Sequence, residues 1–214
     1  MKTNRTELVF ILDKSGSMAG LEADTIGGFN SLLKKQKAEP GEAAVTTVLF
    51  DNNYVLLHDR FDIKGIRPIT SAEYYVEGTT ALLDAVGRTI QKIISVQRNS
   101  SDEMRAGKVM FVIITDGMEN ASREYSYERI KAMIELERDK YGWEFIFLGA
   151  NIDAEAVADE FGIKRDNAVN YHADSRGVEL NYKAVGDAVS SIRQGHKLTR
   201  EWKEELEKDF ENRK

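Results

Sequence analysis

The sequence predicts an α/β fold in which a mostly parallel central sheet lies between two layers of helices. The first observation is a set of short, continuous apolar runs, which are Leu8–Leu12, Val45–Phe50, Val109–Ile114 and Phe145–Leu148. Runs of this length and composition are typical of strands that are buried on both faces. The second observation is that segments with helical spacing separate these runs. Alternation of strands and helices indicates a three-layer α/β sandwich.

Apolar residues three and four positions apart predict the helices between the strands. They are Ile26, Phe29, Leu32 and Leu33 in a helix over Leu21–Gln36; Leu82, Val86, Ile90, Ile93 and Ile94 in a second helix; and Ile130, Met133, Ile134 and Leu136 in a weaker third set. A fourth helix is expected over Ala154–Phe161, with Asp153 as its N-cap and Gly162 at its end.

Two further strands complete the predicted sheet. Asp51-Asn52-Asn53 is typical of a turn, so Val55–Phe61 is expected to return as an antiparallel edge strand. A last short strand is expected near Ala168–Tyr171. The predicted order is therefore strand, helix, hairpin, helix, strand, helix, strand, helix and strand.

The segment after Gly195 differs from the rest of the chain. Leu198, Trp202, Leu206 and Phe210 recur every four residues among mixed charges, which predicts an amphipathic helix. We therefore expect one domain over residues 1–195 and an appended C-terminal helix over residues 196–214. The pattern leaves open whether this helix packs on its own domain or contacts another protein or a second copy of the chain, so it predicts no oligomeric state.

Composition narrows the class of protein. The 214 residues are 42% hydrophobic and 31% charged, as in a globular domain. The formal net charge of -6 argues against a general affinity for nucleic acid or an anionic membrane. There are no cysteines, which excludes disulfides and thiolate chemistry. No signal peptide or membrane-spanning run is recognised, so a cytoplasmic protein is expected.

Oxygen-bearing side chains follow two of the predicted buried strands. The first strand runs into Asp13-Lys14-Ser15-Gly16-Ser17-Met18, and the strand Val109–Ile114 runs into Thr115-Asp116-Gly117. Gly78-Thr79-Thr80 precedes the Leu82 helix. Ligands of open α/β sheets bind at the carboxyl ends of the strands, so these segments are expected to meet at one edge.

A cation would resolve the electrostatic conflict at that edge. Asp13 and Asp116 repel each other if they converge, unless a proton or a metal ion lies between them. Carboxylate and hydroxyl oxygens without cysteine or histidine suit Mg²⁺, or alternatively Mn²⁺ or Ca²⁺. The sequence therefore predicts a divalent-metal site whose remaining coordination positions are left to water or to an incoming carboxylate. Helix capping or a turn explains each of the three segments taken alone. It does not explain why all three are predicted at the same edge of the sheet.

Together, these three elements resemble the metal-ion-dependent adhesion site of the von Willebrand factor A family. The resemblance covers about residues 6 to 171 and implies a Rossmann-like sheet. It assigns Asp13, Ser15, Ser17, Thr80 and Asp116 as metal ligands, and Thr79 remains the alternative to Thr80 because it is one residue away. It also implies that the bound metal contacts an exposed acidic residue of a partner protein. The chain resembles stand-alone bacterial members rather than animal adhesion receptors.

The alternative function is a Mg²⁺-dependent hydrolase or phosphoryl-transfer enzyme. The sequence contains neither GxxxxGK[ST] nor GxGxxG, and Ser15 has no nearby histidine to activate it. We therefore expect a binding module rather than an enzyme. His58, His172 and His196 show no ligand spacing and are expected to be structural or surface residues.

Several other polar residues fall on predicted loops, and we expect them to be solvated loop or cap residues. They are Asp51, Glu77, Glu119, Asn120, Asn151 and Asp153. Glu119, Asn120 and Asn151 follow strand ends on the metal side, so an influence on partner choice is the functional alternative. Asp84 either supports the site from behind Thr80 or faces solvent in the first turn of its helix.

Overall fold

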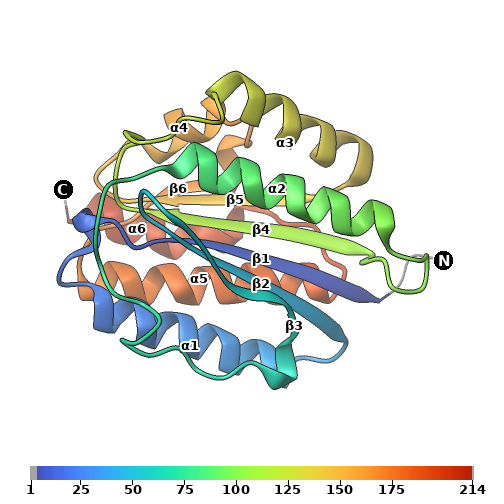
Figure 1. Ribbon diagram of the computed structural model, residues 1–214. Helices are drawn as coiled ribbons and strands as arrows, with labels where there is room; N and C mark the ends of the chain where they lie inside the picture. Colours follow the sequence, from blue (N-terminus) through green and yellow to red (C-terminus); the bar gives the residue numbers. More distant parts are fainter. Residues whose placement is uncertain (1–3, 214) are drawn as a thin grey trace.

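The computed structural model describes residues 4–213 and contains one six-stranded sheet within them (Figure 1). Its strands are β1 (Arg5–Asp13), β2 (Glu42–Phe50), β3 (Tyr54–Asp62), β4 (Lys108–Thr115), β5 (Glu144–Gly149) and β6 (Ala168–Asn170). They lie in the order β3-β2-β1-β4-β5-β6, and all neighbours are parallel except the antiparallel pair β2 and β3. This confirms the predicted fold class, including the antiparallel edge strand.

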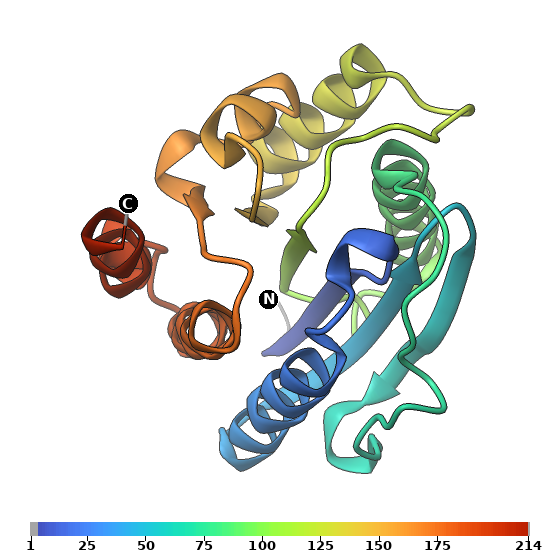
Figure 2. The ribbon, with the colours of Figure 1, turned by 90° about the vertical axis from the view of Figure 1, so that its left-hand side faces the viewer.

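Helices cover both faces of the sheet (Figures 1 and 2). They are α1 (Glu22–Ala38), α2 (Leu82–Asn99), α3 (Tyr127–Tyr141), α4 (Ala154–Glu160), α5 (Ser175–Arg193) and α6 (Glu204–Asn212). Helices α1, α5 and α6 lie on one face, and α2, α3 and α4 lie on the other. The protein is thus a three-layer sandwich.

Strand β1 shows why the sheet has two hydrophobic cores. Side chains alternate between the two faces of a strand, so Phe10 and Leu12 pack with α1 and α5. Val9 and Ile11 pack with α2 on the opposite face. All four side chains are buried. A strand buried on both faces has no polar face to expose, which explains the continuous apolar run in the sequence.

Helix α3 corrects one predicted position. Ile130 and Ile134 are buried as expected, but Leu136 is 48% exposed. The core-facing positions of a helix recur after three or four residues, so the position that follows Ile134 on the inner face is Glu137. Glu137 is 2% exposed. A carboxylate therefore occupies an inner position that the prediction assigned to a neighbouring leucine.

Helix α5 was not predicted. It begins after the N-cap Asp174, whose carboxylate accepts a hydrogen bond from the Gly177 N–H at 2.8 Å. Its inner face packs closely on α1, where a Cβ atom at Gly28 would lie 2.3 Å from the ring of Tyr182. Glycine and serine are weak helix formers, and α5 contains both among its apolar residues. Against this, the buried residues Val178, Tyr182, Val185, Val189 and Ile192 recur with helical spacing, so an amphipathic pattern for this helix is present in the sequence.

The C-terminal segment packs on its own chain. Its predicted single helix is shorter than expected, because a 3-10 turn at Arg200–Lys203 precedes α6. Trp202 and Leu206 are buried in the same hydrophobic core as α1 and α5.

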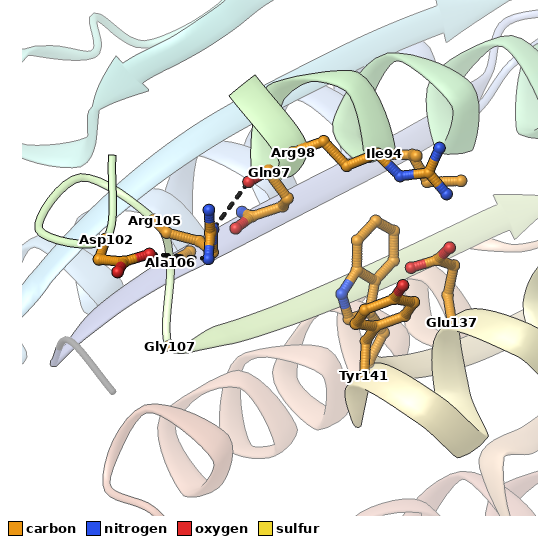
Figure 3. Close-up of a pocket in the computed structure, with 10 residues that line it drawn as sticks. Ile94, Gln97, Arg98, Asp102, Arg105, Ala106, Gly107, Glu137 and Tyr141 are labelled. Carbon is orange, nitrogen blue, oxygen red and sulfur yellow. Dashed lines mark hydrogen bonds and ion pairs between the residues drawn. The ribbon is translucent and has the colours of Figure 1, made fainter. Parts of the chain in front are cut away.

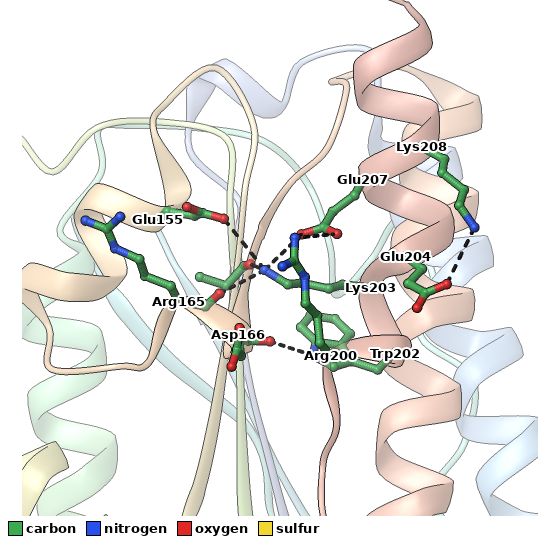
Figure 4. Close-up of polar contacts among 10 residues, drawn as sticks. Glu155, Arg165, Asp166, Arg200, Trp202, Lys203, Glu204, Glu207 and Lys208 are labelled. Atoms are coloured by element: carbon green, nitrogen blue, oxygen red, sulfur yellow. Dashed lines mark hydrogen bonds and ion pairs between the residues drawn. The ribbon is translucent and has the colours of Figure 1, made fainter.

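Polar contacts hold the same segment against β6 and the turn before it (Figure 4). The ammonium of Lys203, 1% exposed, donates to the carbonyls of Arg165 at 2.9 Å and Ala168 at 2.6 Å. Glu207 lies 3.1 Å from this ammonium, and the Trp202 indole donates to the Asp166 carbonyl at 3.1 Å. These bonds explain why the chain makes a tight turn here instead of starting a continuous helix at Leu198.

None of the helices within residues 4–213 is long and apolar enough to cross a membrane. The predicted division into residues 1–195 and 196–214 stays a prediction, and its outer ends, residues 1–3 and 214, lie outside the described part of the chain.

Candidate metal centre

Two neighbouring strands deliver the two candidate carboxylates to one edge of the sheet. Strand β1 ends at Asp13, and β4 ends at Thr115, directly before Asp116. The strands are hydrogen-bonded neighbours, with Leu12 opposite Ile114. Because they run parallel, their carboxyl ends open on the same edge, as the sequence predicts. After Asp13, the chain makes a 3-10 turn over Gly16–Met18, with Ser15 at its N-cap position and Ser17 within it.

The candidate hydroxyl groups form a continuous chain of contacts at this edge. Thr80 Oγ1 donates to Ser15 Oγ at 3.0 Å, and Ser15 Oγ lies 3.0 Å from Ser17 Oγ. Ser17 Oγ in turn donates to Asp116 Oδ1 at 2.5 Å. Thr80 is buried, whereas Thr79 is exposed and its N–H bonds to Asn52 instead. The structure therefore brings Thr80, and not Thr79, into contact with the serines.

Asp13 is held in place by the backbone and by two residues that were not singled out in the sequence. Its Oδ1 accepts a hydrogen bond from the Ser15 N–H at 2.7 Å, and its Oδ2 accepts one from Thr115 Oγ1 at 2.5 Å. The buried Tyr74 hydroxyl donates to the Asp13 carbonyl at 2.6 Å. Burial raises the pKa of Asp13, and the hydrogen bonds from Ser15 and Thr115 oppose that rise. Thr115 and the Ser15 N–H thus fix the direction of the carboxylate, and Tyr74 holds the backbone of Asp13.

Asp116 carries an unsatisfied oxygen. The residue is 1% exposed, and its Oδ2 is buried without a hydrogen-bond partner in the structure. Burial raises the pKa of Asp116 to about 6, with a further rise from the negative charge of Asp13, although the hydrogen bond from Ser17 opposes it. A buried polar atom without a partner is costly. The site therefore stabilises any proton or cation that reaches Oδ2.

Gly117 allows the three segments to approach so closely. A Cβ atom at this position would lie 3.0 Å from Ser17 Oγ and 3.1 Å from Thr80 Oγ1. These distances are shorter than most Cβ contacts, so a larger residue after Asp116 would require the two hydroxyls to shift by a few tenths of an ångström. The glycine of the Asp116-Gly117 pair therefore favours this close approach.

A buried ion pair corrects the expectation for Asp51. Lys14, 2% exposed, contacts Asp51 at 2.6 Å and Glu77 at 3.0 Å, and Asp51 is completely buried instead of solvated. Burial lowers the pKa of Lys14, but the hydrogen bonds and charges of Asp51 and Glu77 outweigh it and raise the pKa overall. Lys14 thereby ties the turn after β1 to the end of β2 and to the loop before Thr80.

Glu119 and Asn120 tie the loop after Asp116 to the loop that carries Thr80. Asn120 Oδ1 accepts from the Thr80 N–H at 2.9 Å, and the Asn120 N–H donates to the Thr80 carbonyl at 3.0 Å. Glu119 accepts the Leu83 N–H at 2.8 Å, which satisfies a free donor of the first turn of α2. These contacts assign both residues a positioning role.

The remaining loop residues have separate roles. Asp84 accepts backbone hydrogen bonds from residues 123–125, so it supports the same loop. Asp153 caps α4 as predicted, by accepting the Ala156 N–H at 3.1 Å. Asn151 is exposed with a φ of 55°, a left-handed conformation that asparagine tolerates.

The donor set fits a hard divalent cation. The cluster offers carboxylate and hydroxyl oxygens, the unsatisfied Asp116 Oδ2 among them, and no nitrogen or sulfur. Oxygen ligands of this kind suit Mg²⁺, Mn²⁺ or Ca²⁺. Within residues 4–213, no group of three or more His, Cys, Asp or Glu side chains is arranged to hold a metal. A metal ion bound here would therefore depend on the hydroxyl ligands as well as the carboxylates.

Comparison with solved structures identifies the fold. The chain is similar to proximal thread matrix protein 1 from the mussel byssus with a zinc-occupied metal-ion-dependent adhesion site, with a TM-score of 0.59 and 12% identity. The match covers 89% of this chain and 47% of the mussel protein. Manganese-loaded TRAP protein from Plasmodium vivax gives a TM-score of 0.54 at 16% identity, over 84% of this chain and 72% of TRAP.

A bacterial protein of similar size also matches. BatB from Bacteroides thetaiotaomicron gives a TM-score of 0.52 at 16% identity, over 89% of this chain and 100% of BatB. The chain spans about half the length of the mussel protein. No protein-family model matches the sequence, and no curated protein is significantly similar to it. On the evidence of its topology and these structural matches, the chain has the von Willebrand factor A fold.

Proposed function

We propose that this protein is a divalent-metal-dependent binding module that recognises an exposed acidic residue of a partner protein. The observation that carries the proposal is the buried, unsatisfied Oδ2 of Asp116, whose other carboxylate oxygen, Oδ1, ends a chain of three hydroxyl groups. A cation at this position would satisfy that oxygen and relieve the repulsion between Asp13 and Asp116.

Asp13, Ser15, Ser17, Thr80 and Asp116 are the residues that would hold the ion, and Mg²⁺ is the proposed ion, with Mn²⁺ or Ca²⁺ as alternatives. A bound divalent cation supplies a positive centre that attracts a carboxylate from another molecule. Zinc and manganese occupy the corresponding proteins of the same fold from mussel and Plasmodium vivax, which supports a divalent ion here. A cytoplasmic location and the absence of nucleic-acid or membrane partners belong to the same proposal.

Binding is preferred over hydrolysis because the candidate nucleophile has no base beside it. Ser15 Oγ contacts the hydroxyls of Ser17 and Thr80, and neither can activate it as a histidine would. Lys14 is engaged with Asp51 and Glu77. Nothing in the described residues favours the Mg²⁺-dependent hydrolase or phosphoryl-transfer alternative.

Thermal unfolding with and without Mg²⁺ tests metal binding. A ligand that binds only the folded state raises the melting temperature by mass action, so millimolar Mg²⁺ should stabilise the wild type. Asp116→Asn, which preserves shape, and Thr80→Val should reduce this stabilisation. Thr79→Val is the matched control, since Thr79 is exposed, and should leave it intact. If Mg²⁺, Mn²⁺ and Ca²⁺ all leave the wild-type melting temperature unchanged, the metal proposal is wrong.

Partner recognition needs a separate experiment. A peptide library is displayed on beads, with Asp or Glu at one position in half of the members and Asn or Gln at that position in the others. In Mg²⁺, the protein should preferentially retain the acidic members. The enrichment should disappear in EDTA and with Asp116→Asn. Equal retention of acidic and amide members contradicts carboxylate recognition. Phosphoester hydrolysis by the wild type that is lost in Asp116→Asn would instead favour the enzyme.

A further inference from the structure

A second candidate site lies at the opposite edge of the sheet from Asp13 and Asp116. A cavity of about 580 Å³ opens between α2 and α3, beside the residues that precede β4 and β5 (Figure 3). Its lining includes Gln97 and Arg98 from α2, Glu137 and Tyr141 from α3, and Trp143 directly before β5. None of these residues takes part in the candidate metal centre.

Glu137 is the unusual member of this lining. It occupies an inner position of α3 and is 2% exposed, yet its Oε1 has no hydrogen-bond partner in the structure. Burial raises the pKa of Glu137, and the positive charges of Arg98 and Lys140 oppose the rise. Buried carboxylates are normally paired or hydrogen-bonded. The side chain points into the cavity, so a ligand there can supply the missing donor (Figure 3).

Aromatic rings lie next to this carboxylate. Trp143 is buried and stacks on Phe111 with 5.6 Å between the ring centroids, so its position is fixed by the core. Tyr141, one turn after Glu137 on α3, is 45% exposed at the mouth of the cavity. A carboxylate beside aromatic faces is an arrangement that attracts an organic cation, through an ion pair and cation–π contacts.

The other polar groups of the cavity define a second property that a ligand must have. Gln97 Nε2 is buried without a hydrogen-bond partner, so it needs an acceptor. Arg105 is paired with Asp102 at 2.9 Å and donates to the Gln97 carbonyl at 2.8 Å. Its charge is therefore balanced within the rim. Arg98 is exposed, where solvent screens its charge.

We propose that this cavity binds an organic cation that carries a carbonyl group, with the ammonium or guanidinium against Glu137 and the carbonyl oxygen facing Gln97. Arginine and lysine have this combination of groups, as a free amino acid or as a residue in a peptide. The aliphatic part of such a side chain would lie along the rings of Tyr141 and Trp143. The site is independent of metal binding at the other edge of the sheet.

The indole N–H signals in a ¹H–¹⁵N spectrum give a direct readout, because the chain has two tryptophans. Titration with N-acetyl-arginine amide should shift the Trp143 signal and leave that of Trp202 unchanged. The same titration with free arginine distinguishes the source: tighter binding of the acetylated amide indicates a peptide, and tighter binding of arginine a free amino acid. N-acetyl-citrulline amide, the neutral analogue, should bind at least about tenfold more weakly. Failure of both arginine probes to shift the Trp143 signal overturns the proposal.

Variants separate recognition of the cation from nonspecific association. Glu137→Gln should weaken N-acetyl-arginine amide at least about tenfold, whereas Glu135→Gln on the same helix, outside the cavity, should not. Tyr141→Ala should weaken binding severalfold, and its exposure makes unfolding a poor explanation. Arg98→Ala should strengthen binding, since a positive charge on the rim is removed. Unchanged affinity in Glu137→Gln, or weaker binding in Arg98→Ala, would show that the cavity does not select cations.

Discussion

Asp116 shows how a single residue connects the fold to the proposed function. Strand β4 places it at the sheet edge, Gly117 lets two hydroxyls approach it, and burial leaves its Oδ2 without a partner. In the absence of metal, the cost of this arrangement is reduced by a proton, which is why the pKa of Asp116 rises to about 6. A proton and a divalent ion therefore compete for the same oxygen.

This competition predicts a characteristic pH dependence. The folded-state pKa of Asp116 is raised from 3.8 to about 6, so the folded protein binds this proton more tightly than the unfolded chain. The resulting stabilisation is complete below about pH 4 and is lost as the pH rises through about 6. In EDTA, Asp116→Asn should therefore gain stability relative to wild type as the pH rises from about 5 to about 7.5.

Urea unfolding at several pH values measures that difference directly. Subtracting the two proteins removes the contributions of the carboxylates that do not interact with Asp116, so the difference reports the coupled pair of Asp116 and Asp13. With Mg²⁺ present, wild type should gain stability relative to Asp116→Asn near neutral pH, because metal binding stabilises the wild type more than the variant. A stability difference in EDTA that stays constant between about pH 5 and about pH 7.5 contradicts the raised pKa.

At the scale of elements, three loops form the site and each is tied to its neighbours by polar contacts. The Gly16 N–H donates to the Gly78 carbonyl at 3.1 Å, which joins the turn after β1 to the loop before α2. Asn120 joins that same loop to the segment after β4. Lys14 adds the end of β2 through Asp51. The hydroxyls are therefore positioned by loops that restrain one another.

Removing Lys14 should uncouple these loops. Lys14→Met leaves the carboxylate of Asp51 buried and unpaired, so we expect a loss of about 3–5 kcal/mol in the free energy of unfolding. Asp51→Asn in the same chain should restore much of that loss, because the amide removes the buried charge and its oxygen can still accept the Asn53 N–H. Urea unfolding of the two single variants and the double variant measures the coupling.

An exposed ion pair provides the control for this cycle. Lys92 and Asp59 lie 2.9 Å apart with side chains 27% and 51% exposed, so Lys92→Met should cost at most about 1 kcal/mol. If Lys14→Met is equally mild, or if Asp51→Asn makes it worse, then Lys14 does not act by neutralising the buried carboxylate.

The elements also show which features can be predicted from sequence. The strands were predictable because burial on both faces leaves an uninterrupted apolar run, as in β1 and β4. Asp13 and Asp116 were recognisable as candidate metal ligands because each comes at or directly after the end of such a strand. Thr80 precedes α2 instead, and only the family resemblance singled it out. Lys14 was not recognised, since its partners Asp51 and Glu77 are 37 and 63 residues away in the chain. Helix α5 was missed although its buried residues recur with helical spacing, at Val178, Tyr182, Val185, Val189 and Ile192.

At the scale of the whole molecule, the sheet separates two candidate sites and the C-terminal segment closes one core. The metal candidates lie at the carboxyl edge, and the cavity around Glu137 lies at the amino edge. On the face covered by α1 and α5, Trp202 and Leu206 of the C-terminal segment complete the hydrophobic core. This shared core suggests that residues up to 212 unfold together with the sheet.

A substitution in the C-terminal helix tests that cooperativity. Leu206 is 1% exposed, so Leu206→Ala should lower the free energy of unfolding by about 2–5 kcal/mol and shift one single transition. Leu136→Ala on α3, whose side chain is 48% exposed, is the matched control and should cost less than about 1 kcal/mol. Far-UV circular dichroism and tryptophan fluorescence should report the same midpoint for both variants. Destabilising a single cooperative unit shifts the midpoint of every probe by the same amount. A separate early transition in Leu206→Ala, with the main midpoint unchanged, would therefore show that the segment after Gly195 unfolds as an independent unit.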